Sequence, residues 1–215
     1  PFCFFEVPRA KKTISVVGDS HMASLQNSLY EHFKYKENFM SLTFSGCYFM
    51  FNISRYQDPQ KLLKSEDCSA QYNELRFKSI NSFIGNNTDS IVILGGRLPM
   101  TINKDNYDNE EGGGQLNGLY LNRDDILLSI SEAINKLLDN GHKIILVYPI
   151  PVVGWDVPKK LFYDSKKANQ KFEDYISEPK LTTSFEVYKK WTNDSFALLD
   201  SIKHKNIKRV YPHKL

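Results

Sequence analysis

The chain alternates short apolar runs with longer stretches in which apolar residues recur every three or four positions. The short runs predict buried strands, and the longer spacing predicts amphipathic helices. The expected strands are residues 13–17, 39–44, 90–96, 143–151 and 207–212. The expected helices are residues 21–33, 67–84, 124–140 and 183–203. Strands and helices that alternate through short connections predict an α/β fold, with a central parallel sheet covered by helices on both sides as a three-layer α/β/α sandwich.

The segments between these elements read as connections. Residues 98–122 form a long polar stretch that we interpret as a functional or mobile loop, since loops of this length are uncommon in compact domains. A second polar, lysine-rich stretch precedes residue 183. The helix over 67–84 is expected to bury one face that carries Tyr72, Leu75, Ile80 and Phe83. We interpret residues 1–12 as a linker or boundary segment and residues 13–215 as one domain.

Composition excludes several classes of protein. The 215 residues are 41% hydrophobic and 25% charged, which is ordinary for a globular domain. The net charge of +3 is scattered, whereas a nucleic-acid-binding protein concentrates basic residues on one face. No run of 18 apolar residues predicts a membrane span. There is no metal-ligand cluster, phosphate-binding loop or dinucleotide fingerprint, so we expect neither a metal nor a cofactor.

The three cysteines leave the redox compartment open. Cys47 and Cys68 bracket a polar, aromatic-rich segment, and Cys3 stands apart from them. A disulfide between Cys47 and Cys68 would require an oxidising compartment, whereas two buried free thiols would fit a cytosolic protein.

Three of the expected strands end in residues that can carry chemistry. These ends are Gly18-Asp19-Ser20-His21, Ser45-Gly46-Cys47 and Gly95-Gly96-Arg97. In parallel sheets ligands gather at the carboxyl ends of the strands. Ser20 stands where a strand turns into a helix, so its hydroxyl could be a nucleophile at the positive helix end or an N-cap. Each of the two alternatives remains open from the tetrapeptide alone.

Gly46 and Arg97 are candidates for stabilising negative charge near Ser20. An oxyanion hole needs two or more donors that converge on one point, and the amides of Ser20 and Gly46 could supply them. Gly46 could equally serve only to turn the chain. Arg97 could donate to an oxyanion, a carboxylate or a sugar hydroxyl, or it could be a surface arginine without a role.

These ordered motifs carry a family resemblance. "VVGDSH" resembles the first block of SGNH/GDSL-type hydrolases and transferases, whose fold is flavodoxin-like. The set "GDSH", "SGC", a second cysteine at Cys68, "IVILGGR" and "YPIP…DVP" is most similar to the SGNH domain fused to acyltransferase-3 membrane proteins. The resemblance covers most of the chain, from about residue 13 to 212. Ordinary SGNH enzymes have Asn in the third block, and the fused subgroup tends to have arginine, as here at Arg97.

The resemblance implies a function and a set of site residues. Ser20 would be the nucleophile, Gly46 and Arg97 would be oxyanion donors, and Asp19 and His21 would have structural or substrate-facing roles. The implied activity is transfer of an acetyl or other acyl group, through an acyl-serine, to hydroxyls of a bacterial surface polysaccharide. The donor would arrive through a transmembrane acyltransferase domain in front of Pro1. The implied location is the periplasm at the inner membrane, which agrees with a Cys47–Cys68 disulfide.

Two other functions fit the same residues. An esterase would use the same acyl-serine with water as acceptor. Whether the acyl group passes to water or to a sugar depends on how well the site excludes water and binds the acceptor. A carbohydrate-binding SGNH domain without catalysis is the alternative of another class. Trp155 and the aromatic run 48–51 could stack on sugar rings or pack in the core or a loop.

One family block has no match at the expected place. The family carries Asp-x-x-His after its final strand, and a serine hydroxyl needs such a base to become a nucleophile. His213 follows the last expected strand without that aspartate. We assign the base to none of the histidines, which are His21, His32, His142, His204 and His213. We therefore expect the sequence to be cut before the catalytic block.

Overall fold

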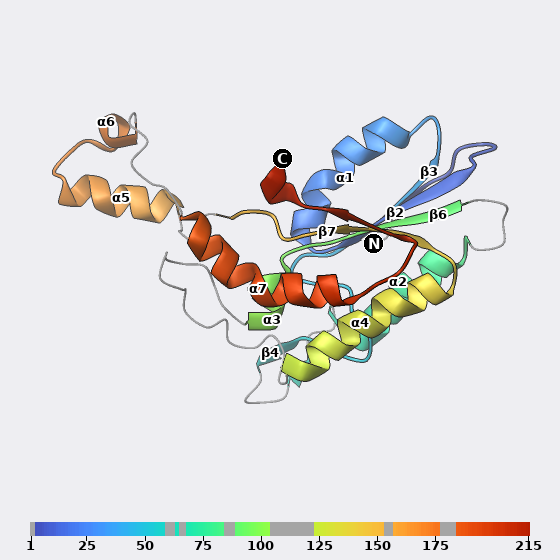
Figure 1. Ribbon diagram of the computed structural model, residues 1–215. Helices are drawn as coiled ribbons and strands as arrows, with labels where there is room; N and C mark the ends of the chain where they lie inside the picture. The colour runs from blue at the N-terminus through green and yellow to red at the C-terminus, as the bar shows by residue number, and fades with distance from the viewer. Residues whose placement is uncertain are drawn as a thin grey trace.

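The computed structural model describes residues 3–58, 63–64, 68–83, 89–103, 123–152, 157–176 and 184–215. Within these residues a six-stranded sheet has the order β1-β3-β2-β6-β7-β8 (Figure 1). Its strands are β1 (Cys3–Phe5), β2 (Lys12–Gly18), β3 (Asn38–Thr43), β6 (Asp89–Leu94), β7 (Lys143–Val147) and β8 (Ile207–Val210). All neighbouring pairs are parallel except β1 with β3, which is antiparallel.

Helices cover both faces of this sheet. The larger ones are α1 (Ser20–Phe33), α2 (Ala70–Asn81), α4 (Arg123–Asp139) and α7 (Phe185–Ser201). In Figure 1, α1 lies on one side of the sheet, and α2, α4 and α7 lie on the other. The core is divided accordingly: Met22 of α1 packs with Ile14 and Val16, whereas Ile80 of α2 and Ile130 of α4 belong to the larger cluster. The α/β/α sandwich predicted from the sequence is confirmed.

Shorter elements complete the described chain. They are the β4–β5 pair (Tyr56–Asp58 and Leu63–Lys64), α3 (Leu98–Asn103), α5 (Val157–Lys167), α6 (Phe172–Ile176) and a 3-10 turn (Pro212–Lys214). Figure 1 shows α5 and α6 together at one end of the molecule, beyond α7. No helix in the described ranges is long and apolar enough to cross a lipid bilayer.

Several expectations for the connections were wrong. Residues 3–5, which we interpreted as part of a linker, form the edge strand β1. The expected loop 98–122 begins with helix α3, and its residues from 104 on lie outside the described part. The polar, lysine-rich stretch before residue 183, for which we expected no helix, contains α5 and α6.

The face predicted for α2 was also partly wrong. Leu75 is 54% exposed, whereas Arg76 is completely buried. The residues of α2 that are buried are Asn73, Arg76 and Ile80, at helical spacing. The helix thus turns a cation and an amide toward the sheet, which a hydrophobic pattern does not reveal.

The strand order places a crevice beside β2. The chain passes from β2 to β3 on one side and later to β6 on the other, so connections diverge at the carboxyl ends of β2 and β6. Gly18 is paired with Thr43 of β3, and Val17 is paired with Leu94 of β6. The three predicted strand-end motifs therefore leave neighbouring strands at the same edge of the sheet.

Candidate active site at the strand ends

Asp19, rather than Ser20, caps helix α1. Asp19 Oδ1 accepts a hydrogen bond from the backbone N–H of His21 at 2.9 Å, which satisfies one of the free amides at the helix start. Ser20 is the first residue of the helix, and its side chain is exposed. The capping alternative for Ser20 is thus wrong. The Ser20 hydroxyl lies at the positive end of a 14-residue helix and does not serve as its N-cap.

The same aspartate joins the β2 end to the β6 end. Asp19 Oδ2 accepts a hydrogen bond from the backbone N–H of Arg97 at 2.6 Å, and Asp19 is only 2% exposed. Gly96 makes this approach possible, because a Cβ at its φ of +137° would lie 2.8 Å from the Asp19 carboxyl group. The structure therefore brings the Ser20 turn and the Arg97 segment into direct contact.

The segment with Gly46 is joined to the same turn from the other side. The N–H of Phe44 donates to the carbonyl of Gly18 at 3.0 Å, and the N–H of Cys47 donates to the carbonyl of Phe44 at 3.1 Å. Gly46 has a φ of +67°, so the left-handed conformation of this turn favours glycine. A Cβ there would lie 2.5 Å from a guanidinium nitrogen of Arg55. Arg55 therefore covers Gly46, which the sequence analysis did not foresee.

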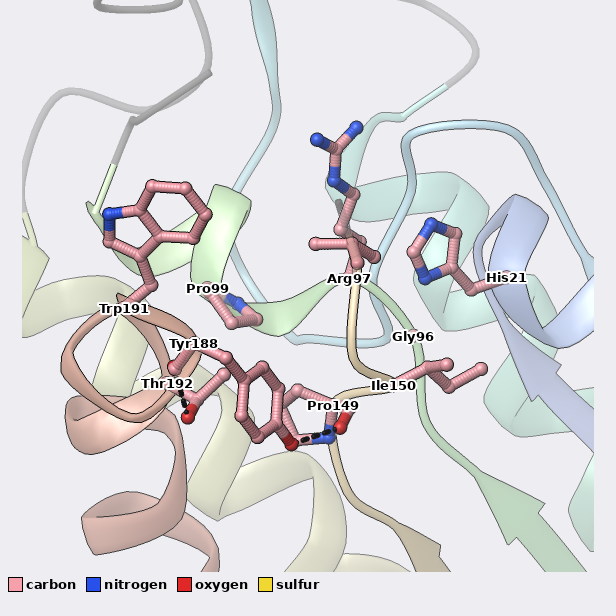
Figure 2. A pocket seen from close by; sticks show the side chains of 10 residues that line it. His21, Gly96, Arg97, Pro99, Pro149, Ile150, Tyr188, Trp191 and Thr192 are labelled. Carbon is pink, nitrogen blue, oxygen red and sulfur yellow. Dashed lines mark hydrogen bonds between the residues drawn. The ribbon is translucent and has the colours of Figure 1, made fainter. Parts of the chain in front are cut away.

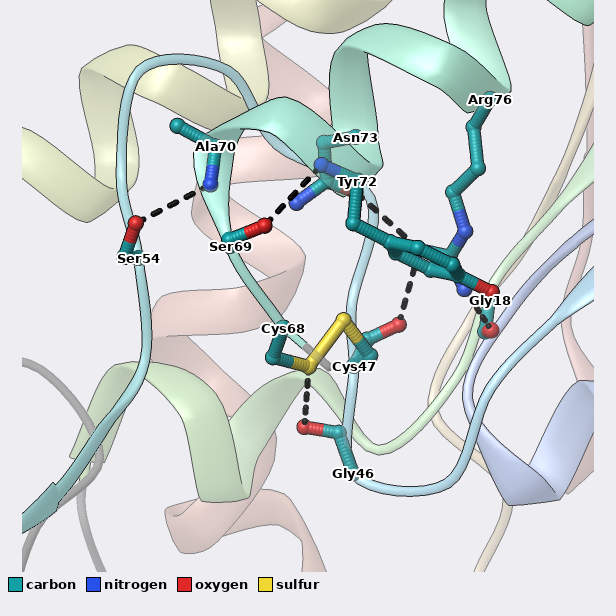
Figure 3. Close-up of a disulfide and its surroundings, with 10 residues drawn as sticks. All are labelled: Gly18, Gly46, Cys47, Ser54, Cys68, Ser69, Ala70, Tyr72, Asn73 and Arg76. Atoms are coloured by element: carbon teal, nitrogen blue, oxygen red, sulfur yellow. Dashed lines mark hydrogen bonds between the residues drawn. A yellow bond between two sulfur atoms is a disulfide. The ribbon is translucent and has the colours of Figure 1, made fainter. Parts of the chain in front are cut away.

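A disulfide holds this segment to the start of α2, so the disulfide, one of the two alternatives left open for these cysteines, is correct. Cys47 and Cys68 are joined, with their Cα atoms 5.6 Å apart and both side chains buried (Figure 3). Ser69, next to Cys68, caps α2 by accepting from the N–H of Tyr72 at 3.1 Å. Cys3 is a free, exposed cysteine on β1.

A pocket opens beside the helix start. It is lined by residues of α1, the segment after β6, helix α3, the segment after β7 and helix α7 (Figure 2). His21 and Arg97 lie on one side of it, and Tyr188 and Trp191 lie across from them. The Tyr188 hydroxyl donates to the Pro149 carbonyl at 2.7 Å, which fixes that wall. The pocket thus combines two basic side chains with a largely apolar and aromatic wall.

Burial keeps two groups near Asp19 neutral. Burial lowers the pKa of His21 below its usual 6.5, with the Arg97 charge acting in the same direction and the Asp19 charge opposing both. Burial, helped by the Asp19 charge, raises the pKa of the Tyr48 phenol. At neutral pH the pocket therefore presents a neutral imidazole beside a charged guanidinium.

The aromatic run 48–51 does not form a sugar-stacking surface. Tyr48, Phe49, Met50 and Phe51 are all 2% exposed or less and belong to the larger core cluster. Core packing, one of the two uses that the sequence left open, is therefore correct. Trp155, the other candidate, lies outside the described residues.

One spacing match escaped the sequence analysis. Asp139 precedes His142 by three residues, which is the spacing of the family's base block. The structure places His142 at the amino edge of the sheet, 1% exposed, with its ring nitrogens 2.7 Å from Ser90 Oγ and 2.8 Å from Asn81 Oδ1. The candidate nucleophile leaves the carboxyl edge, so this pair is not the family's block.

The remaining histidines occupy other positions. His32 is in the last turn of α1, and His204 is in the connection from α7 to β8. His213 follows β8 and lies among four aromatic rings, which are those of Phe185, Tyr188, Phe196 and Tyr211. Tyr188 also lines the pocket, so His213 lies next to a residue of the pocket wall.

Arg76 and the α7 side chains are the site residues that sequence reasoning missed. Arg76 donates to the carbonyls of Gly18 and Cys47, and so touches both turns of the site. The helical spacing of Asn73, Arg76 and Ile80 was the available signal, but an arginine is ordinarily interpreted as exposed. Tyr188 and Trp191 reach the site from far along the chain, and no local pattern marks them.

Comparison with known families supplies the identity. A family model described as "SGNH domain (fused to AT3 domains)" matches residues 1–215. No curated protein matches the chain. The family supports an acyltransferase-like or esterase-like role and suggests a domain that is joined to a transmembrane acyltransferase. The strand-end motifs, the sandwich and the family match agree, and the chain belongs to the family of SGNH domains fused to acyltransferase-3 domains.

Proposed function

We propose that this domain transfers an acyl group, acetyl in the simplest case, to hydroxyls of a bacterial surface polysaccharide through an acyl-serine at Ser20. The observation that carries the proposal is the exposed Ser20 hydroxyl at the first residue of α1, with capping left to Asp19. A helix N-terminus favours negative charge, so an oxyanion formed on an acyl group at this position would be stabilised. The domain would act in the periplasm, beside a membrane acyltransferase domain that delivers the acyl donor.

Each half of the reaction has defined bond changes. In the first half, Ser20 Oγ forms a bond to the acyl carbon, the bond from that carbon to the donor's leaving group breaks, and the hydroxyl proton passes to a base. In the second half, a sugar hydroxyl oxygen forms a bond to the acyl carbon, the bond from that carbon to Ser20 Oγ breaks, and the proton of the sugar hydroxyl passes through the base to Ser20. The amides of Ser20 and Gly46 and the Arg97 side chain would stabilise the oxyanion in both halves.

Asp19 and His21 have supporting roles in this proposal. Both carboxylate oxygens of Asp19 accept hydrogen bonds from backbone N–H groups, so Asp19 would hold the Ser20 turn and the Arg97 segment together. His21 lines the pocket beside Arg97, where it would contact the substrate. The family's base position after the last strand has no Asp-x-x-His between Val210 and Leu215, and no described histidine is assigned that role.

Hydrolysis is the second candidate function. The observation that favours it is the solvent exposure of Ser20, because water can reach an acyl group carried there. The acceptor would then be water, and the same acyl-serine would serve to remove acyl groups from glycans.

The experiment compares Ser20→Ala with Ser24→Ala in the full-length protein that carries this domain. Ser24 is the matched control, one turn later on α1, where its hydroxyl donates to the His21 carbonyl at 2.7 Å. We expect Ser20→Ala to lower acyl transfer to a glycan acceptor by at least about 10³-fold. Ser24→Ala should retain activity. Hydrolysis of p-nitrophenyl acetate, measured with and without the acceptor, separates transfer from esterase activity.

Two outcomes would contradict the proposal. Unchanged turnover in Ser20→Ala would exclude Ser20 as the nucleophile. Glycan binding without any turnover in the wild-type protein would favour the third function, a carbohydrate-binding domain that has lost catalysis.

A further inference from the structure

Arg76 sits between the two turns that carry the candidate oxyanion donors. It projects from α2, is completely buried, and has its guanidinium 4.8 Å from the centre of the Tyr72 ring (Figure 3). One terminal nitrogen donates to the Gly18 carbonyl at 2.9 Å. The other donates to the Cys47 carbonyl at 3.2 Å and to Asn73 Oδ1 at 3.1 Å. A single planar group thus binds two backbone carbonyls that are 29 residues apart in the sequence.

The two carbonyls adjoin the residues of the proposed site. The Gly18 carbonyl belongs to the peptide that leads into Asp19, directly before Ser20. The Cys47 carbonyl belongs to the residue that follows Gly46. A peptide group is planar, so fixing these carbonyls also fixes the N–H groups of Asp19 and Tyr48, one residue before Ser20 and two residues after Gly46. Contact with both carbonyls therefore restrains the directions of the Ser20 and Gly46 segments relative to each other.

Cys47 is held from three sides. Its N–H donates to Phe44, its carbonyl accepts from Arg76, and its side chain is bonded to Cys68. The disulfide ties this residue to the start of α2, the same helix from which Arg76 projects. Arg76 and the disulfide therefore form one brace from α2 to the Gly46 turn.

We propose that Arg76 is a positioning residue that sets the Gly46 turn against the Ser20 turn, so that their amides converge on the acyl oxygen. The proposal rests on the function proposed above. Arg76 acts through the two carbonyls and does not touch the substrate, because it is buried beneath both turns. Lysine cannot replace it, since an ammonium group is a point charge and lacks the planar pair of nitrogens that spans two acceptors.

The test compares Arg76→Lys and Arg76→Met with Arg209→Lys. Arg209 is a matched control, because its guanidinium also donates to two backbone carbonyls, those of Leu199 and Ile202. It further donates to the hydroxyl of Tyr148, the residue directly after β7, at 3.1 Å. Thermal unfolding of all three variants identifies those that fold.

The first readout is geometric and needs no catalysis. In amide NMR spectra, Arg76→Lys should shift the signals of Ser20 and Gly46, and Arg209→Lys should shift those near Tyr148 instead. The second readout is kinetic. Arg76→Lys should lower kcat by about 10²-fold with KM almost unchanged, since misplaced donors weaken binding of the transition state rather than of the substrate. Arg209→Lys should leave kcat within about twofold of the wild type.

The outcomes separate this inference from the proposed function. Unshifted Ser20 and Gly46 amides in a folded Arg76→Lys variant would overturn the positioning role, whatever the activity. Equal losses of kcat in Arg76→Lys and Arg209→Lys would overturn it too, because they would show only a general effect of stability. If Ser20 were not the nucleophile, turnover would be unchanged in Ser20→Ala. The amide shifts would still decide the role of Arg76.

Discussion

Buried polar groups have different roles at the amino ends of the parallel strands (the amino edge of the sheet) and at their carboxyl ends (the carboxyl edge). At the amino edge, His142 is buried and both ring nitrogens have partners within the protein, Ser90 and Asn81. At the carboxyl edge, Asp19 is buried and satisfied by two backbone amides, and this leaves the Ser20 hydroxyl exposed and His21 on a pocket. The comparison teaches that buried polar groups can complete a fold or can prepare neighbouring groups for a ligand. Asp139 and His142 have the spacing of the family's base block but lie at the amino edge, so the position in the sheet distinguishes the two cases better than the spacing does.

Among the variants that compare the two edges, the largest effect should come from Asp19, the aspartate that links two turns. Asp19→Asn keeps a good N-cap. Its one side-chain oxygen can serve the cap, and its NH₂ group, a donor, then lies where the Arg97 N–H needs an acceptor. We expect a loss of turnover of about 10²-fold, because the Arg97 segment moves away from Ser20. The measurement is steady-state kinetics of acyl transfer by the folded variant.

The matching change at the other edge is Ser90→Ala, which removes one partner of His142. It should lower the free energy of unfolding by about 1–3 kcal/mol and leave turnover unchanged. Similar losses of turnover in both variants would remove the distinction between the edges.

Two glycines with positive φ sharpen the comparison through stability. In Gly96→Ala the new methyl group would meet the Asp19 carboxyl group at 2.8 Å, and the backbone at φ +137° disfavours any side chain. We expect a loss of about 3 kcal/mol in the free energy of unfolding. In Gly141→Ala, next to His142, the methyl group would meet nothing within 4 Å, so only the strain at φ +89° remains.

Urea unfolding of both variants measures this difference, and Gly141→Ala should lose about 1 kcal/mol. A Gly96→Ala protein as stable as Gly141→Ala would mean that the contact between Gly96 and Asp19 is not tight in solution.

The last comparison concerns pH. Burial lowers the pKa of His142 to about 4 from the 6.5 of a free imidazole. Between these values the unfolded chain binds a proton that the folded chain does not, so stability is full above about pH 6.5 and falls as the pH falls toward 4. The contribution of His142 to this loss is up to about 3 kcal/mol.

The check is the free energy of unfolding in urea at about pH 7.5 and about pH 5, for wild type and His142→Gln. The variant should show a weaker dependence on pH, although His21 still contributes in the same direction because its pKa is also lowered. An equal dependence in both proteins would contradict a neutral, buried His142.

The sequence predicted the sheet well, because its central strands are short, apolar and bounded by glycine and proline. The antiparallel strand β1 was missed, since three residues carry too little pattern, and α5 was missed because its lysines made the segment read as a polar connection. Ser20, Gly46 and Arg97 could be selected because each follows a strand end. Arg55, Arg76 and Trp191 could not be, since their roles depend on contacts between distant segments.

The most direct test of the proposed function is to trap the acyl-serine. The full-length protein is mixed with its acyl donor without acceptor, quenched in acid and digested with trypsin. The peptide of residues 13–34 contains both Ser20 and its control, Ser24, and fragmentation assigns the modified residue. We predict an acyl group on Ser20, which disappears in Ser20→Ala and persists in Ser24→Ala. An acyl group on another residue, with Ser20 unmodified while transfer proceeds, would contradict the central claim.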